Sequence, residues 1–95
     1  MTFVDWTAPA KADLARIDNY FAQADPAFAD SVGYAAIAAG RFLVQWPGAG
    51  SPIEGETSNK WPVKGTPYVL VYRPLADRIE VLRVRHERED WANDP

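Results

Sequence analysis

Cysteine is absent from this 95-residue sequence, and histidine occurs once, as His86. The lack of cysteine excludes disulfides, thiolate nucleophiles and cysteine-based zinc sites. A single histidine excludes metal sites built on a histidine pair, and we expect no metal and no other cofactor. The two glycines at Gly48 and Gly50 are not followed by Gly-Lys-Ser/Thr, so a phosphate-binding loop is not predicted either.

The sequence also lacks a long apolar run. The longest mostly apolar stretch, residues 32–46, contains Arg41 and several small residues, and it is too short to span a bilayer. The N-terminus shows neither the basic region nor the apolar region of a signal peptide. We therefore expect a soluble, cytoplasmic protein with no membrane partner.

The sequence does contain the material for one core. Its residues are 47% hydrophobic and 13% aromatic, which is too rich for a disordered chain. The length fits a single domain over residues 1–95. Net charge is −3, so direct sequence-specific nucleic-acid binding is not expected, because such affinity comes largely from phosphate neutralisation. Residues 60–88 nevertheless hold seven basic and three acidic side chains, which keeps an acidic partner possible at one face.

The first half of the chain has the pattern of a strand followed by two helices. Residues 2–6 predict a short strand, after which Thr7 can cap a helix. Apolar residues then recur at spacings of three and four, which predicts an amphipathic helix over about residues 10–24 with Asp13 facing water. An Asp-Pro pair ends this helix and begins a second one over about residues 26–44. Because the connection is short, the two helices should pack antiparallel.

The second half has the pattern of strands. Residues 60–64 predict an edge strand, because Pro62 cannot donate a hydrogen bond to a neighbouring strand. Residues 68–72 are apolar or aromatic throughout, which predicts a central strand buried on both faces. Residues 79–86 predict the strand that returns beside it. Strict alternation would place Leu82, Val84 and His86 on one face and Ile79, Val81, Arg83 and Arg85 on the other.

The expected fold class is α+β, with an N-terminal strand, an antiparallel helical hairpin and a three-stranded antiparallel C-terminal meander. The helices should cover one face of the sheet. The other face would carry an apolar strip of Ile79, Val81 and residues of the central strand, bordered by arginines. Such a strip is typical of a binding surface, although a modestly exposed sheet face has the same appearance.

Three segments resemble the ParE branch of the RelE/ParE toxin superfamily. They are residues 11–17 (KADLARI), 67–73 (PYVLVYR) and 79–91 (IEVLRVRHEREDW), and the resemblance covers residues 5–91 in the same element order. In this family of plasmid-stabilisation proteins, a small toxin is held inactive by an antitoxin encoded beside it. The resemblance therefore implies the toxin of a type II toxin–antitoxin system with a ParD-like antitoxin as its partner.

The family contains two mechanisms. ParE-like members inhibit DNA gyrase without cleaving RNA, whereas RelE-like members resemble ribosome-dependent mRNA endoribonucleases. Val69 stands where ribonuclease-type members carry an arginine in the central strand, and no tyrosine follows Tyr72. Both features favour gyrase inhibition without catalysis. An mRNA endoribonuclease and a non-toxic, partner-binding family member remain the alternatives, so enzymatic activity is left open.

The candidate site residues differ between these mechanisms. Gyrase inhibition needs no catalytic residue, whereas a ribonuclease would use Lys60, Arg73, Arg83 and His86. The candidate target-binding residues are Arg83, Arg85, His86, Arg88 and Trp91. The candidate antitoxin-binding residues are Leu14, Ile17, Phe21, Val69, Val71, Ile79 and Val81.

Overall fold

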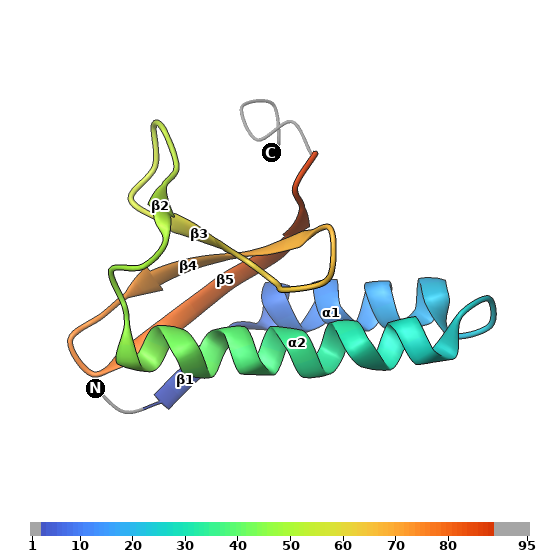
Figure 1. The fold of residues 1–95 in the computed structure, drawn as a ribbon. Coiled ribbons are helices and arrows are strands. Elements are labelled where there is room, and N and C mark those ends of the chain that lie inside the picture. The colour runs from blue at the N-terminus through green and yellow to red at the C-terminus, as the bar shows by residue number, and fades with distance from the viewer. Residues whose placement is uncertain (1–2, 89–95) are drawn as a thin grey trace.

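Two helices cover one face of a five-stranded mixed sheet in the computed structural model, which describes residues 3–88 (Figure 1). The helices lie side by side and antiparallel, as predicted. The elements are β1 (Phe3–Trp6), α1 (Ala8–Phe21), α2 (Pro26–Gln45), β2 (Ser51–Pro52), β3 (Asn59–Pro62), β4 (Tyr68–Pro74) and β5 (Arg78–His86).

Side-chain caps fix where both helices begin. The Thr7 hydroxyl accepts a hydrogen bond from the backbone N–H of Ala10 at 3.4 Å, and the Asp25 carboxylate accepts one from the N–H of Phe28 at 3.1 Å. Each cap satisfies a donor that a helix start leaves without an intrahelical partner. The predicted helices are confirmed with shifted bounds, because α1 ends at Phe21 and residues 22–24 form a turn.

Helix α2 is longer than the apolar stretch that the sequence suggested. By length and composition alone it would pass as a membrane-spanning helix, contrary to the expectation that this region is too short. In the fold it instead lies against the sheet and α1, and its buried side faces both.

The sheet has the strand order β1-β5-β4-β3-β2. Strand β4 is central and antiparallel to both β3 and β5, so the predicted meander is matched in part, as the middle of a larger mixed sheet. Two further strands extend it. β1 pairs parallel with the first half of β5, and β2 pairs antiparallel with the start of β3. The prediction of an edge strand over residues 60–64 holds for Trp61 and Pro62, which pair with β4 alone, but not for Lys60, which lies between β2 and β4.

A β-bulge changes the faces of β5. Tyr72 of β4 lies opposite Val81, whereas the preceding residue, Val71, lies opposite Arg83, so Leu82 is the extra residue. The inserted residue shifts the alternation of side chains between the two faces by one position. Odd-numbered residues of β5 therefore face the helices before the bulge, and even-numbered residues face them after it. Side chains of both parities consequently face the helices.

The predicted apolar strip on the open face of the sheet is therefore wrong. Ile79 and Val81 are completely buried and belong to the same core as Val84. Val69 and Val71 alternate with core residues of β4 and so face away from the helices, yet they too are buried. The open sheet face thus offers little apolar area.

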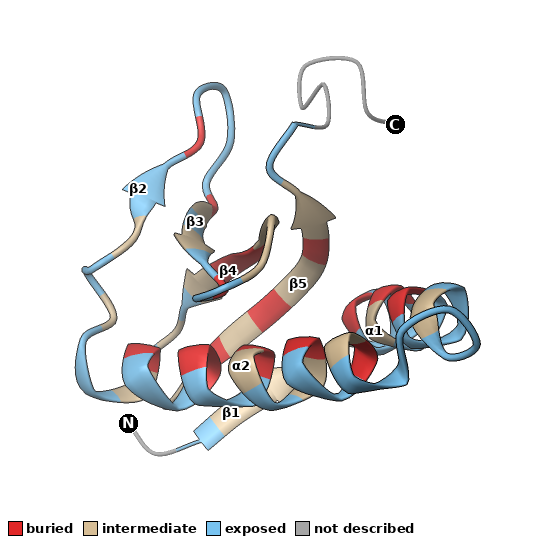
Figure 2. Cartoon of the chain, turned by 45° about the vertical axis from the view of Figure 1, so that its right-hand side comes forward, coloured by how far each residue is buried: buried red, intermediate tan, exposed pale blue. Residues whose placement is uncertain are grey.

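The core lies between the sheet and the two helices. Figure 2 shows the buried residues of α1, α2 and β5 turned toward one another, with exposed residues along the outer side of α2. The buried cluster is Ala10, Ile17, Val32, Ala36, Ala39, Leu43, Val63, Leu70, Tyr72, Ile79, Val81 and Val84.

Candidate functional site

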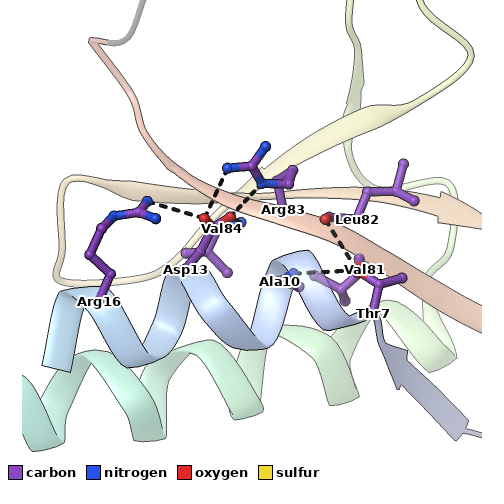
Figure 3. Close-up of polar contacts among 8 residues, drawn as sticks. All are labelled: Thr7, Ala10, Asp13, Arg16, Val81, Leu82, Arg83 and Val84. Atoms are coloured by element: carbon purple, nitrogen blue, oxygen red, sulfur yellow. Dashed lines mark hydrogen bonds and ion pairs between the residues drawn. The ribbon is translucent and has the colours of Figure 1, made fainter. Parts of the chain in front are cut away.

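The second half of β5 has an unusual edge. Among residues 3–88, β1 pairs with β5 only as far as Val81, so no strand continues along this edge. Helix α1 lies there instead and supplies polar side chains (Figure 3). The Thr7 hydroxyl donates to the Val81 carbonyl at 2.8 Å, and the Asp13 carboxylate accepts from the Val84 N–H at 2.9 Å. The N-cap of α1 and a side chain of the helix therefore satisfy backbone groups that an open edge would leave to water.

Asp13 also binds two arginines. Its two oxygens accept hydrogen bonds from Arg83 at 2.7 Å (Nε) and 2.9 Å (Nη2), a bidentate pair, and from Arg16 Nη2 at 3.1 Å. The side chain of Asp13 is only 1% exposed, so the prediction that it faces water is wrong. Asp13 lies at the margin of the apolar stripe of α1. This margin of the helix packs against the edge of β5.

This arrangement keeps the buried carboxylate ionised. Burial by itself raises the pKa of Asp13, because it removes water from the charged form. The hydrogen bonds from Arg83 and the Val84 N–H, together with the positive charge of Arg83, outweigh burial and hold the pKa of Asp13 below its ordinary value. The charge thus fastens α1 to the strand that carries most of the candidate target-binding residues.

His86 lies at the end of β5 on the side of α1. Its ring packs edge-on against Tyr68, with ring centroids 5.6 Å apart, and its Nδ1 accepts a hydrogen bond from the Arg88 N–H at 3.1 Å. His86, Arg16 and Tyr20 are among the residues that line an open cleft of about 280 Å³ between α1 and β5. The predicted parity of Val84 and His86, which places both on one face, is confirmed.

The four candidate ribonuclease residues are not brought together. Arg73 lies opposite Glu80 and binds it at 2.6 Å, whereas His86 lies opposite Tyr68 at the other end of the same strand pair. Tyr68 and Arg73 are five positions apart along β4, which corresponds to about 17 Å. Lys60 lies on the far side of β4, and Arg83 is held by Asp13. This geometry does not form a compact acid–base site.

The candidate target-binding residues divide between two faces. Arg83 and Arg85 belong to the face of β5 opposite His86, and Arg88 is exposed just beyond the strand. Trp91 lies outside the described residues. The described members of this set therefore lie on both faces of β5 and just beyond its end, and they do not converge on one point.

The candidate antitoxin-binding residues lie mostly inside the protein. Ile17 is in the core, and Leu14 and Phe21 pack against it, with Phe21 meeting Phe28 edge-on at 4.8 Å. The four strand residues of that set are buried as well. The large apolar side chains that are exposed were not singled out from the sequence. Within residues 3–88 they are Phe3, Tyr20, Tyr34, Ile37, Phe42 and Trp46.

The described residues contain no obvious cation site. Within residues 3–88, no three histidine, aspartate or glutamate side chains are grouped so as to hold a metal ion. The polar chemistry of the site is therefore that of arginines, one carboxylate and one imidazole.

Comparisons with known proteins agree with this fold. The family described as "ParE toxin of type II toxin-antitoxin system, parDE" matches residues 4–91. A solved structure described as "Chromosomal ParDE TA system from P. aeruginosa" is similar, with 25% sequence identity and a TM-score of 0.78. That similarity covers 90% of this chain and 96% of the other. No curated protein matches the chain. Since the family match spans nearly the whole sequence, this chain belongs to the ParE toxin family of type II toxin–antitoxin systems.

Proposed function

We propose that this chain acts in the cytoplasm as a toxin that inhibits DNA gyrase without catalysing a reaction, and that a ParD-like antitoxin neutralises it. The observation that carries this proposal is that Arg83 is already bound within the protein. A ribonuclease would need this guanidinium to stabilise phosphate, but here it forms a bidentate pair with the buried Asp13. The remaining candidate catalytic groups do not gather beside it, because His86 belongs to the other face of β5 and Arg73 is bound to Glu80.

The charge distribution supports protein binding at the end of β5. Arg85 and Arg88 belong to the segment of the chain with the largest positive balance, whereas the chain as a whole is acidic. A local positive patch on an acidic protein favours an acidic protein surface, because such patches steer association and set the orientation of partners. Inhibition by docking then requires no proton transfer.

The antitoxin part of the proposal rests on family membership. The similar P. aeruginosa structure is described as a ParDE system, in which toxin and antitoxin are the two components. An antitoxin would have to cover the gyrase-binding residues, or hold them away from gyrase, in order to neutralise the toxin.

A supercoiling assay tests the proposal directly. The full chain, separated from its antitoxin, should inhibit supercoiling by purified gyrase in a concentration-dependent manner, and added antitoxin should restore it. Arg85→Glu combined with Arg88→Glu should raise the concentration needed for inhibition by about tenfold or more, the effect of about 1.4 kcal/mol. Lys11→Glu, on the exposed side of α1, is the matched control and should leave inhibition unchanged.

Two results would overturn the proposal. Cleavage of mRNA on ribosomes that is lost in His86→Ala would identify an endoribonuclease instead. A chain that neither inhibits gyrase nor slows growth when produced without its antitoxin would be a partner-binding family member without toxicity.

A further inference from the structure

The outer side of α2 carries a regular stripe of exposed residues. Asp30, Tyr34, Ile37 and Arg41 follow one another at spacings of four, three and four, and all four are exposed. This is the spacing of a seam between two packed helices. Tyr34 is 75% and Ile37 45% exposed, which leaves a large apolar area in water. Figure 2 shows that exposed residues of α2 lie on its side turned away from the sheet.

A groove lies beside this stripe, between α2 and β1. Its volume is about 470 Å³, and Phe3, Ile37 and Arg41 are among the residues that line it. Phe3 is itself 49% exposed. The stripe therefore presents both a projecting aromatic side chain, Tyr34, and an apolar recess one helical turn away from it.

The order of residues in the stripe is self-complementary. A two-fold axis passing between Ala35 and Ala36 would bring Tyr34 of one helix opposite Ile37 of an antiparallel second copy. The same axis would bring Asp30 opposite Arg41, because both pairs are symmetric about that point. A two-fold interface requires this kind of reciprocity, in which one patch fits its own copy.

The two charges have no ion-pair partner among the residues that the structure describes. Over residues 3–88, the ion pairs do not include Asp30 or Arg41. They cannot pair with each other, because eleven residues of helix separate them by about 16 Å. A parallel pair of helices would place Asp30 against Asp30 and Arg41 against Arg41, so charge selects the antiparallel arrangement.

We propose that the stripe of Asp30, Tyr34, Ile37 and Arg41 on α2 is a dimerisation surface for a second copy of this chain. Each Tyr34 ring enters the groove of the other copy, where it contacts Phe3 and Ile37 and lies near the Arg41 guanidinium. Burial of two aromatic side chains and a cation–π contact supply the attraction. Two reciprocal Asp30–Arg41 pairs fix the register. This surface lies away from the proposed gyrase-binding residues, so the proposal does not depend on that function.

Sedimentation velocity on the full chain over a wide range of concentrations tests the proposal. The wild type should shift from 10.6 kDa toward twice that mass as its concentration rises. Asp30→Arg alone and Arg41→Asp alone should each weaken self-association at least tenfold, because each places like charges together. An equimolar mixture of the two variants should form a dimer again, since every facing pair in the mixed dimer has opposite charges.

Two tyrosine variants provide a matched comparison. Tyr34→Ala should weaken the dimer at least tenfold, whereas Tyr20→Ala, at a position equally exposed on α1, should not change it. A wild type that stays monomeric throughout, or a dimer that none of the α2 variants affects, would overturn the proposal. A monomeric chain whose antitoxin binding is weakened by Tyr34→Ala would instead assign this surface to the antitoxin, and would also overturn it.

Discussion

The two ends of the sheet are tied to the rest of the chain in different ways. At the β5 edge, the charged Asp13 of α1 binds the Val84 N–H and Arg83. Toward the β2 end, the neutral hydroxyl of Tyr72 in the central strand β4 holds the loop before β2: it donates to the Pro47 carbonyl and accepts from the Gly50 N–H, both at 2.9 Å. Each anchor is buried, and each holds a segment from outside the central strands.

The two anchors depend on different conditions. The charged anchor is the stronger one, because ionic hydrogen bonds exceed neutral ones, but it requires Asp13 to be ionised. The neutral anchor keeps its proton up to high pH, because burial raises the pKa of Tyr72, although the hydrogen bond from Gly50 opposes this. It requires close contact instead, since only glycine fits beside the Tyr72 ring. An ionic interaction therefore stabilises the β5 edge, and close packing against the Tyr72 ring stabilises the loop before β2.

Removing the charged anchor should have the largest effect on stability. Asp13→Ala leaves Arg83 and the Val84 N–H without their acceptor, and breaking a buried pair in this way costs about 3 kcal/mol in the free energy of unfolding. Urea unfolding followed by circular dichroism measures the loss. Asp18→Ala, an exposed site on the same helix, is the control and should stay within about 0.5 kcal/mol of wild type. Equal losses in the two variants would show that Asp13 is no anchor.

Filling the close contact should break the neutral anchor with a somewhat smaller effect. A Cβ atom at Gly50 would lie 2.5 Å from the Tyr72 hydroxyl and 2.7 Å from the Lys60 carbonyl oxygen. Gly50→Ala should therefore cost about 2 kcal/mol, as overpacking of a tight contact does. Gly48→Ala, in the same loop, would place its Cβ where no neighbouring atom lies within 4 Å, and it should be nearly neutral. Equal free energies of unfolding for the two variants would show that the close contact at Gly50 does not contribute to stability.

The pH dependence of stability should sharpen the contrast between the ends. Because the pKa of Asp13 is lowered by folding, its ionic contribution is complete above the unfolded value of about 3.9 and is lost as pH falls through the folded pKa. Asp13→Asn should therefore be about 1.5 kcal/mol less stable than wild type at pH 7. The difference should shrink as the pH falls below about 4. A difference that is the same at pH 7 and at low pH would contradict the ionic role.

The exposed ion pair of β4 and β5 should have the smallest effect. Arg73 binds Glu80 at 2.6 Å, but the arginine side chain is 43% exposed and water screens the pair. Glu80→Ala should cost about 0.5 kcal/mol, and less in high salt. If Glu80→Ala lowered the free energy of unfolding as much as Asp13→Ala does, the difference in burial between the two ion pairs would not determine their contributions to stability.

Local sequence signals were sufficient for much of the fold. The helix starts at Thr7 and Asp25 follow from side chains that act within three residues, and the central position of β4 follows from its unbroken apolar run. These features depend on neighbours along the chain, and for that reason they can be predicted from one sequence.

Features set by distant parts of the chain were missed. The bulge at Leu82 has no local signature, and it alone reversed the prediction that Ile79 and Val81 are exposed. Asp13 looked like a solvent-facing residue because its partners lie far along the chain, at Arg83 and Val84. The stripe on α2 does have a readable spacing, but its exposure depends on which side of the helix the sheet covers.

The parallel pairing of β1 with β5 has a consequence for how the protein is made. Thr7 and Val81, which bond to each other, are 74 positions apart, so β1 has no neighbour in the sheet until β5 has been synthesised. Contacts this far apart in sequence form late and slowly. At translation rates of about 5–20 residues per second, the nascent chain spends several seconds with β1 unpaired and with Asp13 lacking its partner Arg83. The finished fold, and any toxicity that depends on it, therefore appears only after β5 has been synthesised.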